Sequence, residues 1–444
     1  MDHWLKASAA ELGRGIGAGE IDPVALTEAY LTAIAAHPFR DRIYARVTSE
    51  RALAEAEAAQ ARAKAGQRLS VLDGVPISWK DLFDSAGVAT EAGSALLKDR
   101  VPARDALVLR NATALGLVCL GKTHMSELAF SGLGLNPVTA TPPCVNDHDA
   151  VSGGSSSGAA TSVAFDLAAC GIGSDTGGSV RIPSAWNDLV GLKTTAGRVS
   201  LSGVVDLCAK FDTVGPLCRS VEDAALMLAA LEGGKPADLQ GATLKGKCLA
   251  VLQTVVLEDT REVPLNAFDT AVAKLAEAGA EIVKIEAPEV AEAMSLAGPL
   301  YTAEAYGRWG EVIEASPDLM FDRILERFRG GRSVGGPDYV RAWQKLEALR
   351  ATWNERVAGF DAVLCPTAPI LPPKADRLMT DDQYYVTENL LALQNTRVGN
   401  LMGNCGVSLP TGVPSCGILL NGLPGQEERL LRIAAAAELA LQEG

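Results

Sequence analysis

Residues 151–193 constrain the fold of this chain more than any other stretch, because two clusters rich in glycine and serine bracket a patterned segment there. The first cluster reads GGSSSG at residues 153–158, and the second reads TGGS at residues 176–179. Between them, small residues at 158–165 follow a helical pattern, and the apolar run at 167–172 is typical of a buried strand. Glycine allows positive φ and close backbone approach, so such clusters often arrange N–H groups around an anion. We therefore expect two rigid turns, the second holding a nucleophilic serine beside an oxyanion cradle.

Two other interpretations of these clusters fit the sequence less well. A lone GGSSSG is typical of a flexible linker, but here an apolar helical face and a strand run follow it. A phosphate loop needs G-x-x-x-x-G-K-[ST] or G-x-G-x-x-G, and Gly171-x-Gly173 is followed by Thr176 where the third glycine belongs. Rigid turns are the better interpretation.

The composition is that of a globular chain, with 48% hydrophobic and 21% charged residues over 444 positions. The net charge of −14 argues against a surface that binds nucleic acid or an anionic membrane. Lys6, Glu11 and Arg14 interrupt the apolar segment of a signal peptide, and no apolar run is long enough to span a bilayer. Nine cysteines without a C-x-x-C pair predict reduced thiols and a cytoplasmic location. Because the four histidines do not cluster, we expect no metal site. We also expect no other cofactor.

Helices alternate with short apolar strands along most of the chain. Ser8 with Glu11 predicts a capping box, and Asp22-Pro23 predicts the start of the next helix. Further helices are expected at residues 50–67, 105–115, 220–232, 264–278 and from 426, and strands at 116–121, 247–252, 281–285, 363–366, 406–410 and 417–420. This alternation predicts an α/β fold with a large mixed, mostly parallel sheet covered by helices on both faces. Since no linker interrupts it, we expect a single domain over residues 1–444.

Lys80 is a candidate base. It ends an apolar strand between Trp79 and Asp81, where a surface lysine has no reason to lie. Burial lowers the pKa of an amine and so favours the neutral form that accepts a proton, although strand-end lysines are more often ion-pair partners. His124 and His148 lack the serine and acidic context of a Ser-His-Asp base.

Four segments together resemble the amidase signature family of serine hydrolases: GVPISWKDLFDSAG, GKTHMSELAFSG, SGGSSSGAA and GSDTGGSVRIPSAWNDLVGLKTTAGRVS. The resemblance covers essentially the whole chain, with a signature core at about 71–225 and a looser match at 296–360. The spacing from Lys80 to Ser155 and from Ser155 to Ser179 fits the lysine–serine–serine triad of that family.

The resemblance implies roles for the triad. Ser179 would attack an amide carbonyl, and Ser155 would relay the proton to a neutral Lys80 and return it to the leaving nitrogen. In this family a cis peptide bond precedes the bridging serine, here between Gly154 and Ser155. An acyl-enzyme on Ser179 would then be released by water.

The same resemblance implies the surrounding site. The oxyanion hole would consist of the backbone N–H groups of Thr176, Gly177, Gly178 and Ser179. The supporting positions are Gly154, Ser156, Asp175 and Arg181, and the acyl-pocket positions are Ala129, Ser131 and Ser155. The chain departs from the GGSSGGSA of many relatives at Ser157 and Ala159, which affects helix packing and leaves the triad intact.

Residues 296–400 hold much of the aromatic content and predict long amphipathic helices. We expect substrate specificity to reside there and near Ala129. The residues that either face a pocket or pack between helices are Tyr301, Glu304, Tyr306, Tyr339 and Arg341.

The expected function is an amidase that converts a small-molecule carboxamide to a carboxylic acid and ammonia or an amine, with a homodimer as the default assembly. The alternatives are a glutaminase subunit of a tRNA-dependent amidotransferase, a hydrolase of urea-like amides such as allophanate, a fatty-acid amide hydrolase and an inactive scaffold. Ile182 in place of glutamine and the short chain count against the glutaminase subunit, and the lack of an apolar anchor counts against the fatty-acid amide hydrolase. A scaffold should have lost Lys80, Ser155 or Ser179, and all three are present.

Overall fold

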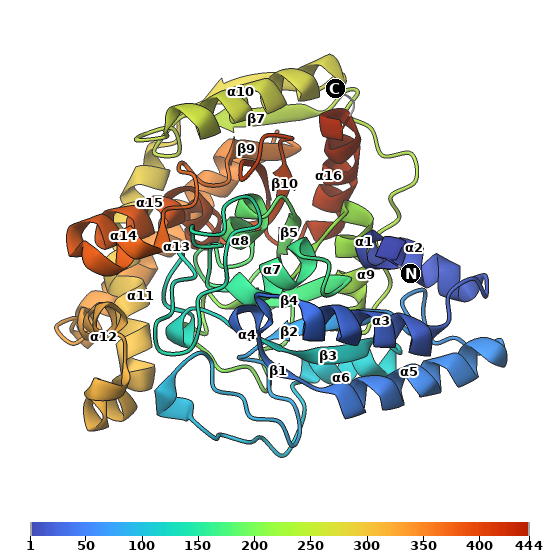
Figure 1. Ribbon diagram of the computed structural model, residues 1–444. Coiled ribbons are helices and arrows are strands. Elements are labelled where there is room, and N and C mark those ends of the chain that lie inside the picture. The colour runs from blue at the N-terminus through green and yellow to red at the C-terminus, as the bar shows by residue number, and fades with distance from the viewer. Residues whose placement is uncertain (1, 443–444) are drawn as a thin grey trace.

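A computed structural model describes residues 2–442 of the chain. Its strands are β1 (Tyr44–Val47), β2 (Pro76–Lys80), β3 (Val118–Thr123), β4 (Cys170–Asp175), β5 (Val190–Lys193), β6 (Thr213–Cys218), β7 (Cys248–Leu252), β8 (Glu281–Ile285), β9 (Ala362–Pro366), β10 (Cys405–Pro410) and β11 (Gly417–Gly422). These strands form one sheet in the order β1-β3-β2-β4-β6-β5-β10-β11-β9-β7-β8. Figure 1 shows this sheet running from the N-terminal helices up to β7, the neighbour of the edge strand β8.

Sixteen α-helices accompany the sheet in the described residues. They are α1 (Asp2–Lys6), α2 (Ala9–Gly17), α3 (Pro23–Ala36), α4 (Arg40–Ile43), α5 (Ser49–Lys64), α6 (Leu107–Ala114), α7 (Ser157–Ala164), α8 (Arg181–Trp186), α9 (Val221–Glu232), α10 (Glu262–Glu277), α11 (Pro288–Ala315), α12 (Asp322–Arg329), α13 (Gly336–Val357), α14 (Ala375–Thr380), α15 (Asp382–Leu401) and α16 (Glu427–Gln442). Both predicted helix starts are confirmed, because Ser8 and Glu11 form a capping box and Asp22 caps α3.

The mixed α/β sheet is confirmed, but the expectation that most strand pairs are parallel is wrong. Six of the ten pairs in the described sheet are antiparallel. Parallel neighbours need a crossover that returns the chain, usually a helix. No helix separates β5 from β6 or β10 from β11, and both pairs are antiparallel.

The strand predicted at 167–172 lies three residues later in the chain, as β4. The apolar residues Leu167, Ala168 and Ala169 are buried before the strand begins. The small polar end of the strand at residues 173–175, which lies beyond the predicted strand, is also buried. Burial of small residues under a helix, and not their polarity, decides where this strand ends.

Close packing of α7 and α8 on the sheet sets the position of both glycine clusters. A Cβ atom at Gly171 on β4 would lie 2.4 Å from the carbonyl oxygen of Ala159 on α7. A Cβ atom at Gly191 on β5 would lie 2.4 Å from Ser184 Oγ on α8. Glycine on the strands therefore lets the two helices approach the sheet more closely than any other residue would.

The main hydrophobic core lies on the opposite side of these strands. Cys218 on β6 packs there with Val221 and Ala224 of α9, whereas the neighbouring Leu217 packs with Val163 of α7. Successive strand residues point to opposite faces. The sheet is therefore covered on both faces in its centre, as predicted.

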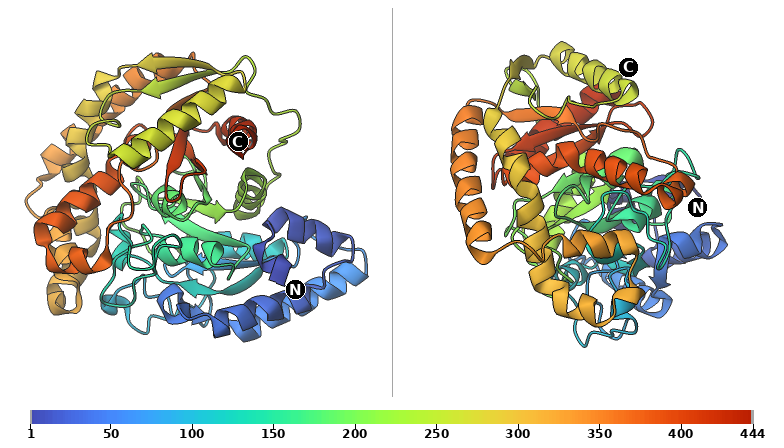
Figure 2. Two further views of the ribbon diagram at one scale, coloured as in Figure 1. Left: turned by 45° about the horizontal axis from the view of Figure 1, so that its top comes forward. Right: turned by 90° about the vertical axis from the view of Figure 1, so that its left-hand side faces the viewer.

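The helices α11, α12, α13 and α15 gather along one side of the sheet, where Figure 2 shows them in yellow and orange. They belong to the segment expected to hold long amphipathic helices, and α11 alone spans 28 residues. Within residues 2–442, no helix is both long and apolar enough to cross a membrane.

Candidate active site

Lys80 lies at the carboxyl end of β2 with its side chain fully buried. Its Nζ atom donates hydrogen bonds to Ser155 Oγ at 2.7 Å and to Ser174 Oγ at 2.8 Å. Both partners are neutral hydroxyl groups, and no carboxylate of the described residues lies within 4.0 Å of Nζ. The predicted lysine is thus held at the predicted serine without an ion pair.

Burial lowers the pKa of Lys80 from 10.5 to about 7. The negative charges of Asp212 and Asp175 raise it, but by less than burial lowers it. A lysine with a pKa near 7 is neutral in a large fraction of molecules at physiological pH, and only the neutral amine accepts a proton. This position therefore gives Lys80 the protonation behaviour that a base requires.

The turn formed by the first glycine cluster places Ser155 beside Lys80. The peptide bond between Gly154 and Ser155 is cis, as the family resemblance implies. Gly154 donates its N–H to the carbonyl of Gly132 at 2.9 Å, and a Cβ atom there would lie 2.5 Å from Ser126 Oγ. This turn has room only for glycine.

The two clusters contact each other through the backbone. Ser156 donates its N–H to the carbonyl oxygen of Ser179 at 3.2 Å, and its Oγ donates to the carbonyl of Ser174 at 3.2 Å. Ser179 is only 3% exposed. These contacts bring Lys80, Ser155 and Ser179 into one buried region.

The carbonyl groups of the turn at 176–179 are all held by donors. Tyr301 OH donates to the carbonyl of Thr176 at 3.0 Å, and Thr396 Oγ1 donates to that of Gly177 at 2.8 Å. The carbonyl of Gly178 accepts the N–H of Ile182 at 2.8 Å. Because the carbonyl and the next N–H of a planar trans peptide point in opposite directions, these bonds also fix the direction of the N–H groups.

The expected oxyanion hole needs one correction. Gly178 donates its N–H to Asp175 Oδ1 at 2.8 Å, so this group is occupied. Within the described residues, the N–H groups of Thr176, Gly177 and Ser179 have no acceptor. These three donors remain for a developing oxyanion.

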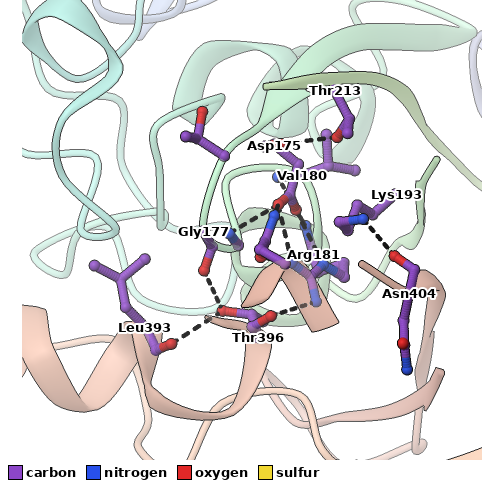
Figure 3. A network of polar contacts seen from close by, with 12 residues as sticks. Asp175, Gly177, Val180, Arg181, Lys193, Thr213, Leu393, Thr396 and Asn404 are labelled. Carbon is purple, nitrogen blue, oxygen red and sulfur yellow. Dashed lines mark hydrogen bonds and ion pairs between the residues drawn. The ribbon is translucent and has the colours of Figure 1, made fainter. Parts of the chain in front are cut away.

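Asp175 and Arg181 form the buried network in Figure 3. Arg181 donates to both oxygens of Asp175, through Nε at 3.0 Å and Nη2 at 2.9 Å, and to the carbonyl of Thr396 at 2.7 Å. The carboxylate also accepts the N–H of Val180 at 3.1 Å. The Arg181 charge and these hydrogen bonds hold the pKa of Asp175 well below its usual value, despite complete burial. Both residues thus support the turn, as expected.

A narrow cavity of about 30 Å³ lies at Ser179. Ala129 and Ser131, two of the three acyl-pocket candidates, line it together with Thr176 and Gly177. Ser155 lies behind this surface, on Lys80. The described structure therefore brings Ala129 and Ser131 to the candidate nucleophile.

A wider cavity of about 720 Å³ opens beside the narrow one. The two share four lining residues, Phe130, Tyr301, Arg327 and Arg397. Of the five candidates named in the variable region, Tyr301 lines both cavities. Glu304, Tyr306, Tyr339 and Arg341 are absent from both linings in the described chain.

Sequence reasoning missed several residues of this region. Ser174, the second partner of Lys80, was missed because the predicted strand ended before it. A strand extended to residue 175 would have placed it beside β2. Asp212 accepts from Thr176 Oγ1 at 2.5 Å, and Arg327 and Arg397 line the cavities. Arg327 and Arg397 belong to no motif with recognisable spacing, whereas Asp212 lies inside the signature core at about 71–225, where no role was assigned to it.

Comparison with known proteins agrees with this geometry. The family described as Amidase matches residues 25–431. A 2-amino-5-chloromuconic acid deaminase of Comamonas testosteroni is 34% identical over 391 residues, covering 85% of this chain and 84% of the relative. One chain of the glutamyl-tRNA(Gln) amidotransferase of Anaeromyxobacter sp. (strain K) is 34% identical over 477 aligned positions, covering 97% of this chain and 95% of the relative.

A solved structure shares both the fold and part of the sequence. The native peptide amidase of Stenotrophomonas maltophilia superimposes with a TM-score of 0.85 at 27% identity, covering 98% of this chain and 97% of that one. The family match extends over most of the chain, including both glycine clusters and the lysine at the end of β2. The chain therefore belongs to the amidase family, in which it carries the amidase signature.

Proposed function

We propose that this protein hydrolyses the C–N bond of a small carboxamide, with Ser179 as nucleophile, Ser155 as proton relay and Lys80 as base. Membership of the amidase family supports amide hydrolysis as the reaction class. The roles are those that the family resemblance implies, and the geometry around Lys80 supports the roles of Lys80 and Ser155.

In this proposal Ser179 Oγ attacks the amide carbonyl carbon. The Ser179 proton passes to Ser155 Oγ, while the Ser155 proton passes to the neutral amine of Lys80. The free N–H groups of Thr176, Gly177 and Ser179 bind the oxyanion. When the C–N bond breaks, Lys80 returns the proton through Ser155 to the leaving nitrogen. Water then hydrolyses the acyl-enzyme by the same route and releases the acid.

One observation carries the proposal: a fully buried lysine without a carboxylate partner lies 2.7 Å from the serine of the first cluster. A lysine that served only as a structural cation would be expected to bond to carboxylate or carbonyl oxygens, as the buried Lys193 does with the carbonyls of Thr194 and Asn404. Lys122 on the neighbouring strand does so, with Asp81 at 3.1 Å.

The test is ammonia release by the purified chain alone from aliphatic amides, aromatic amides, glutamine and urea-like amides. The matched control is Ser179→Ala, which removes one oxygen from a residue that is 3% exposed. We expect release by the wild type and a loss of at least about 10⁴-fold in the variant. Equal release by both proteins would remove Ser179 from the proposed role.

A second candidate is the glutaminase component of an amidotransferase, since one chain of a glutamyl-tRNA(Gln) amidotransferase aligns over 97% of this chain. In that case glutamine is the donor, and activity depends on partner proteins. Glutamine turnover that appears only after such partners are added would favour this candidate. Turnover of simple amides by the chain alone would favour the independent amidase.

We also propose that the protein is located in the cytoplasm. The nine cysteines, all within the described residues, are free thiols, and eight of them are buried. Disulfides are rare in reducing compartments, and this supports the proposed location.

A further inference from the structure

Two arginines lie where the narrow cavity adjoins the wide one. Arg327 lies on α12 and Arg397 on α15, and each lines both cavities. Ser179 lines the same narrow cavity. The two guanidinium groups thus share one small space with the candidate nucleophile.

Neither arginine has an acidic partner. Within residues 2–442, no carboxylate oxygen lies within 4.0 Å of either guanidinium, and Arg327 Nη1 is buried without any hydrogen bond. Their contacts are with aromatic faces, Arg327 at 4.5 Å from the Phe130 ring centre and Arg397 at 6.0 Å from that of Tyr301. A cation–π contact leaves the N–H groups at the edge of a guanidinium free to donate.

The arrangement is electrostatically unfavourable without a ligand. Burial lowers the pKa of Arg327 to about 10, and the nearby positive charge of Arg397 lowers it further in the same direction. Burial also lowers the pKa of Arg397. Two like charges in a partly desolvated site cost free energy that a bound anion would offset.

The acidic residues at the rim of the wide cavity do not supply that anion. Asp382 pairs with Arg323 at 2.6 Å, and Glu326 pairs with Arg329 at 3.0 Å. Asp322 also lines the cavity and is exposed to solvent. The rim acids are therefore engaged or solvated, and the two inner arginines are left for a group that enters from outside.

We propose that Arg327 and Arg397 bind an ionised carboxylate of the substrate, so that the substrate is a short carboxamide carrying a second carboxyl group. This inference rests on the proposed function and specifies its substrate class. The five donors of a guanidinium match a planar carboxylate. Ser179 and both arginines line the same narrow cavity, and this proximity favours a short chain between the carboxylate and the reacting amide.

The test compares the monoamides malonamate, succinamate and glutaramate with the corresponding diamides. Each pair has nearly the same shape and differs by one negative charge. We expect kcat/KM to be about 10- to 100-fold higher for at least one monoamide than for its diamide, the ratio that a charged hydrogen bond provides. Arg327→Gln and Arg397→Gln should reduce this preference to within about threefold, mainly through KM.

Two further variants keep the result interpretable. Arg329→Gln removes from the same helix a guanidinium that lines neither cavity and pairs with Glu314 and Glu326, and it should leave the preference unchanged. Arg327→Lys keeps the charge and should retain part of the preference. Two results together would overturn the carboxylate site: equal kcat/KM for the charged and the neutral amide, and Arg327→Gln kinetics equal to those of the wild type. The amidase proposal would still stand.

Binding separates failure of the site from failure of the reaction. Calorimetry with Ser179→Ala should show succinate or glutarate binding at least tenfold tighter than acetate, with the difference lost on adding Arg397→Gln. This result would support the carboxylate site even if no amide in the panel were hydrolysed, in which case the proposed function would be the part that fails. Equal binding of acetate and the dicarboxylates would indicate a general anion site and contradict the substrate assignment.

Discussion

Two buried regions with charged groups meet at Ser179, and they differ in how those charges are satisfied. On the signature side, Asp175 and Arg181 bond to each other. Asp175 also accepts the N–H of Gly178 in the turn at 176–179, and Arg181 donates to the carbonyl of Thr396. On the variable side, Arg327 and Arg397 face a cavity with aromatic neighbours and no acidic partner in the described chain. The first region is complete in the protein itself, whereas the second is completed by a ligand.

The difference separates two tasks. A fully bonded network holds peptide groups in one direction, which is what stabilisation of an oxyanion requires. Arg327 and Arg397 make favourable ionic contacts only when an anion binds, and this binding energy can discriminate among substrates. Loss of a group from the first region should therefore reduce rate or stability for every substrate. Loss from the second should reduce discrimination among substrates.

The largest expected effect is that of Lys80→Met on the rate. Methionine has a similar length, so the buried space stays filled while the base is removed. We expect kcat to fall by about 10²–10⁴-fold for charged and neutral amides alike. The fall in kcat is measured as the steady-state rate of ammonia release.

Stability distinguishes a chemical loss from a folding defect. Since the folded-state pKa of Lys80 is lowered to about 7, the unfolded chain binds its proton more tightly. Lys80→Met should then unfold at no lower urea concentration than the wild type near pH 7. A variant that unfolds much earlier would attribute the lost rate to damaged structure.

Asp175→Asn should have the next largest effect, on stability. The change leaves Arg181 charged and buried without its carboxylate, and breaking such a pair typically costs about 3–5 kcal/mol. Urea denaturation at pH 7 measures the loss. The control is Asp206→Asn, in an ion pair with the exposed Arg308, for which less than about 1 kcal/mol is expected. Similar losses in the two variants would contradict the contrast between a closed network and an open surface.

Much of the signature region could be predicted from sequence, because its function needs unusual residues at fixed places. Glycine at 154 is required by the space available, and Lys80 is conspicuous in an apolar strand. The hydroxyl groups of Tyr301 and Thr396, which hold the turn, come from helices more than 100 residues away in the chain. No local pattern predicts those contacts.

The cavity wall could not be predicted, for a physical reason. Arg327 and Arg397 are ordinary residues on amphipathic helices, where arginine usually faces solvent. Only the packing of α12 and α15 beside the sheet turns both side chains toward one space. Arg341, which looked equally suitable, lies exposed and pairs with Asp338 on its own helix. Parallel strand pairing was overestimated for a similar reason, since local alternation does not reveal which strands become neighbours.

The pH dependence should separate the two regions within one experiment. As pH falls below about 7, Lys80 becomes protonated, and kcat should decrease about tenfold per pH unit. The pKa of Arg327 is about 10, so this side chain stays charged over the whole titration of Lys80. The KM for a monoamide should therefore stay constant between about pH 5.5 and about pH 8.5, a range that spans this titration. Above pH 7 kcat should level off. Initial rates over this range check both parameters, and a KM that rises in parallel with the loss of kcat would show that the two regions are coupled.

The smallest effect is expected for Arg341→Gln, which marks the outer limit of the cavity wall. Arg341 lies on α13, its side chain is 68% exposed, and its ion pair with Asp338 lies at the surface. Such a pair contributes about 0–1 kcal/mol to stability, and the residue lines neither cavity of the described chain. The ratio of kcat/KM for monoamide and diamide should therefore match the wild type within about twofold. A fivefold drop in this ratio would place α13 in contact with the substrate. It would then be a long-range field from several helices, and not the two guanidinium groups beside Ser179, that selects the charged amide.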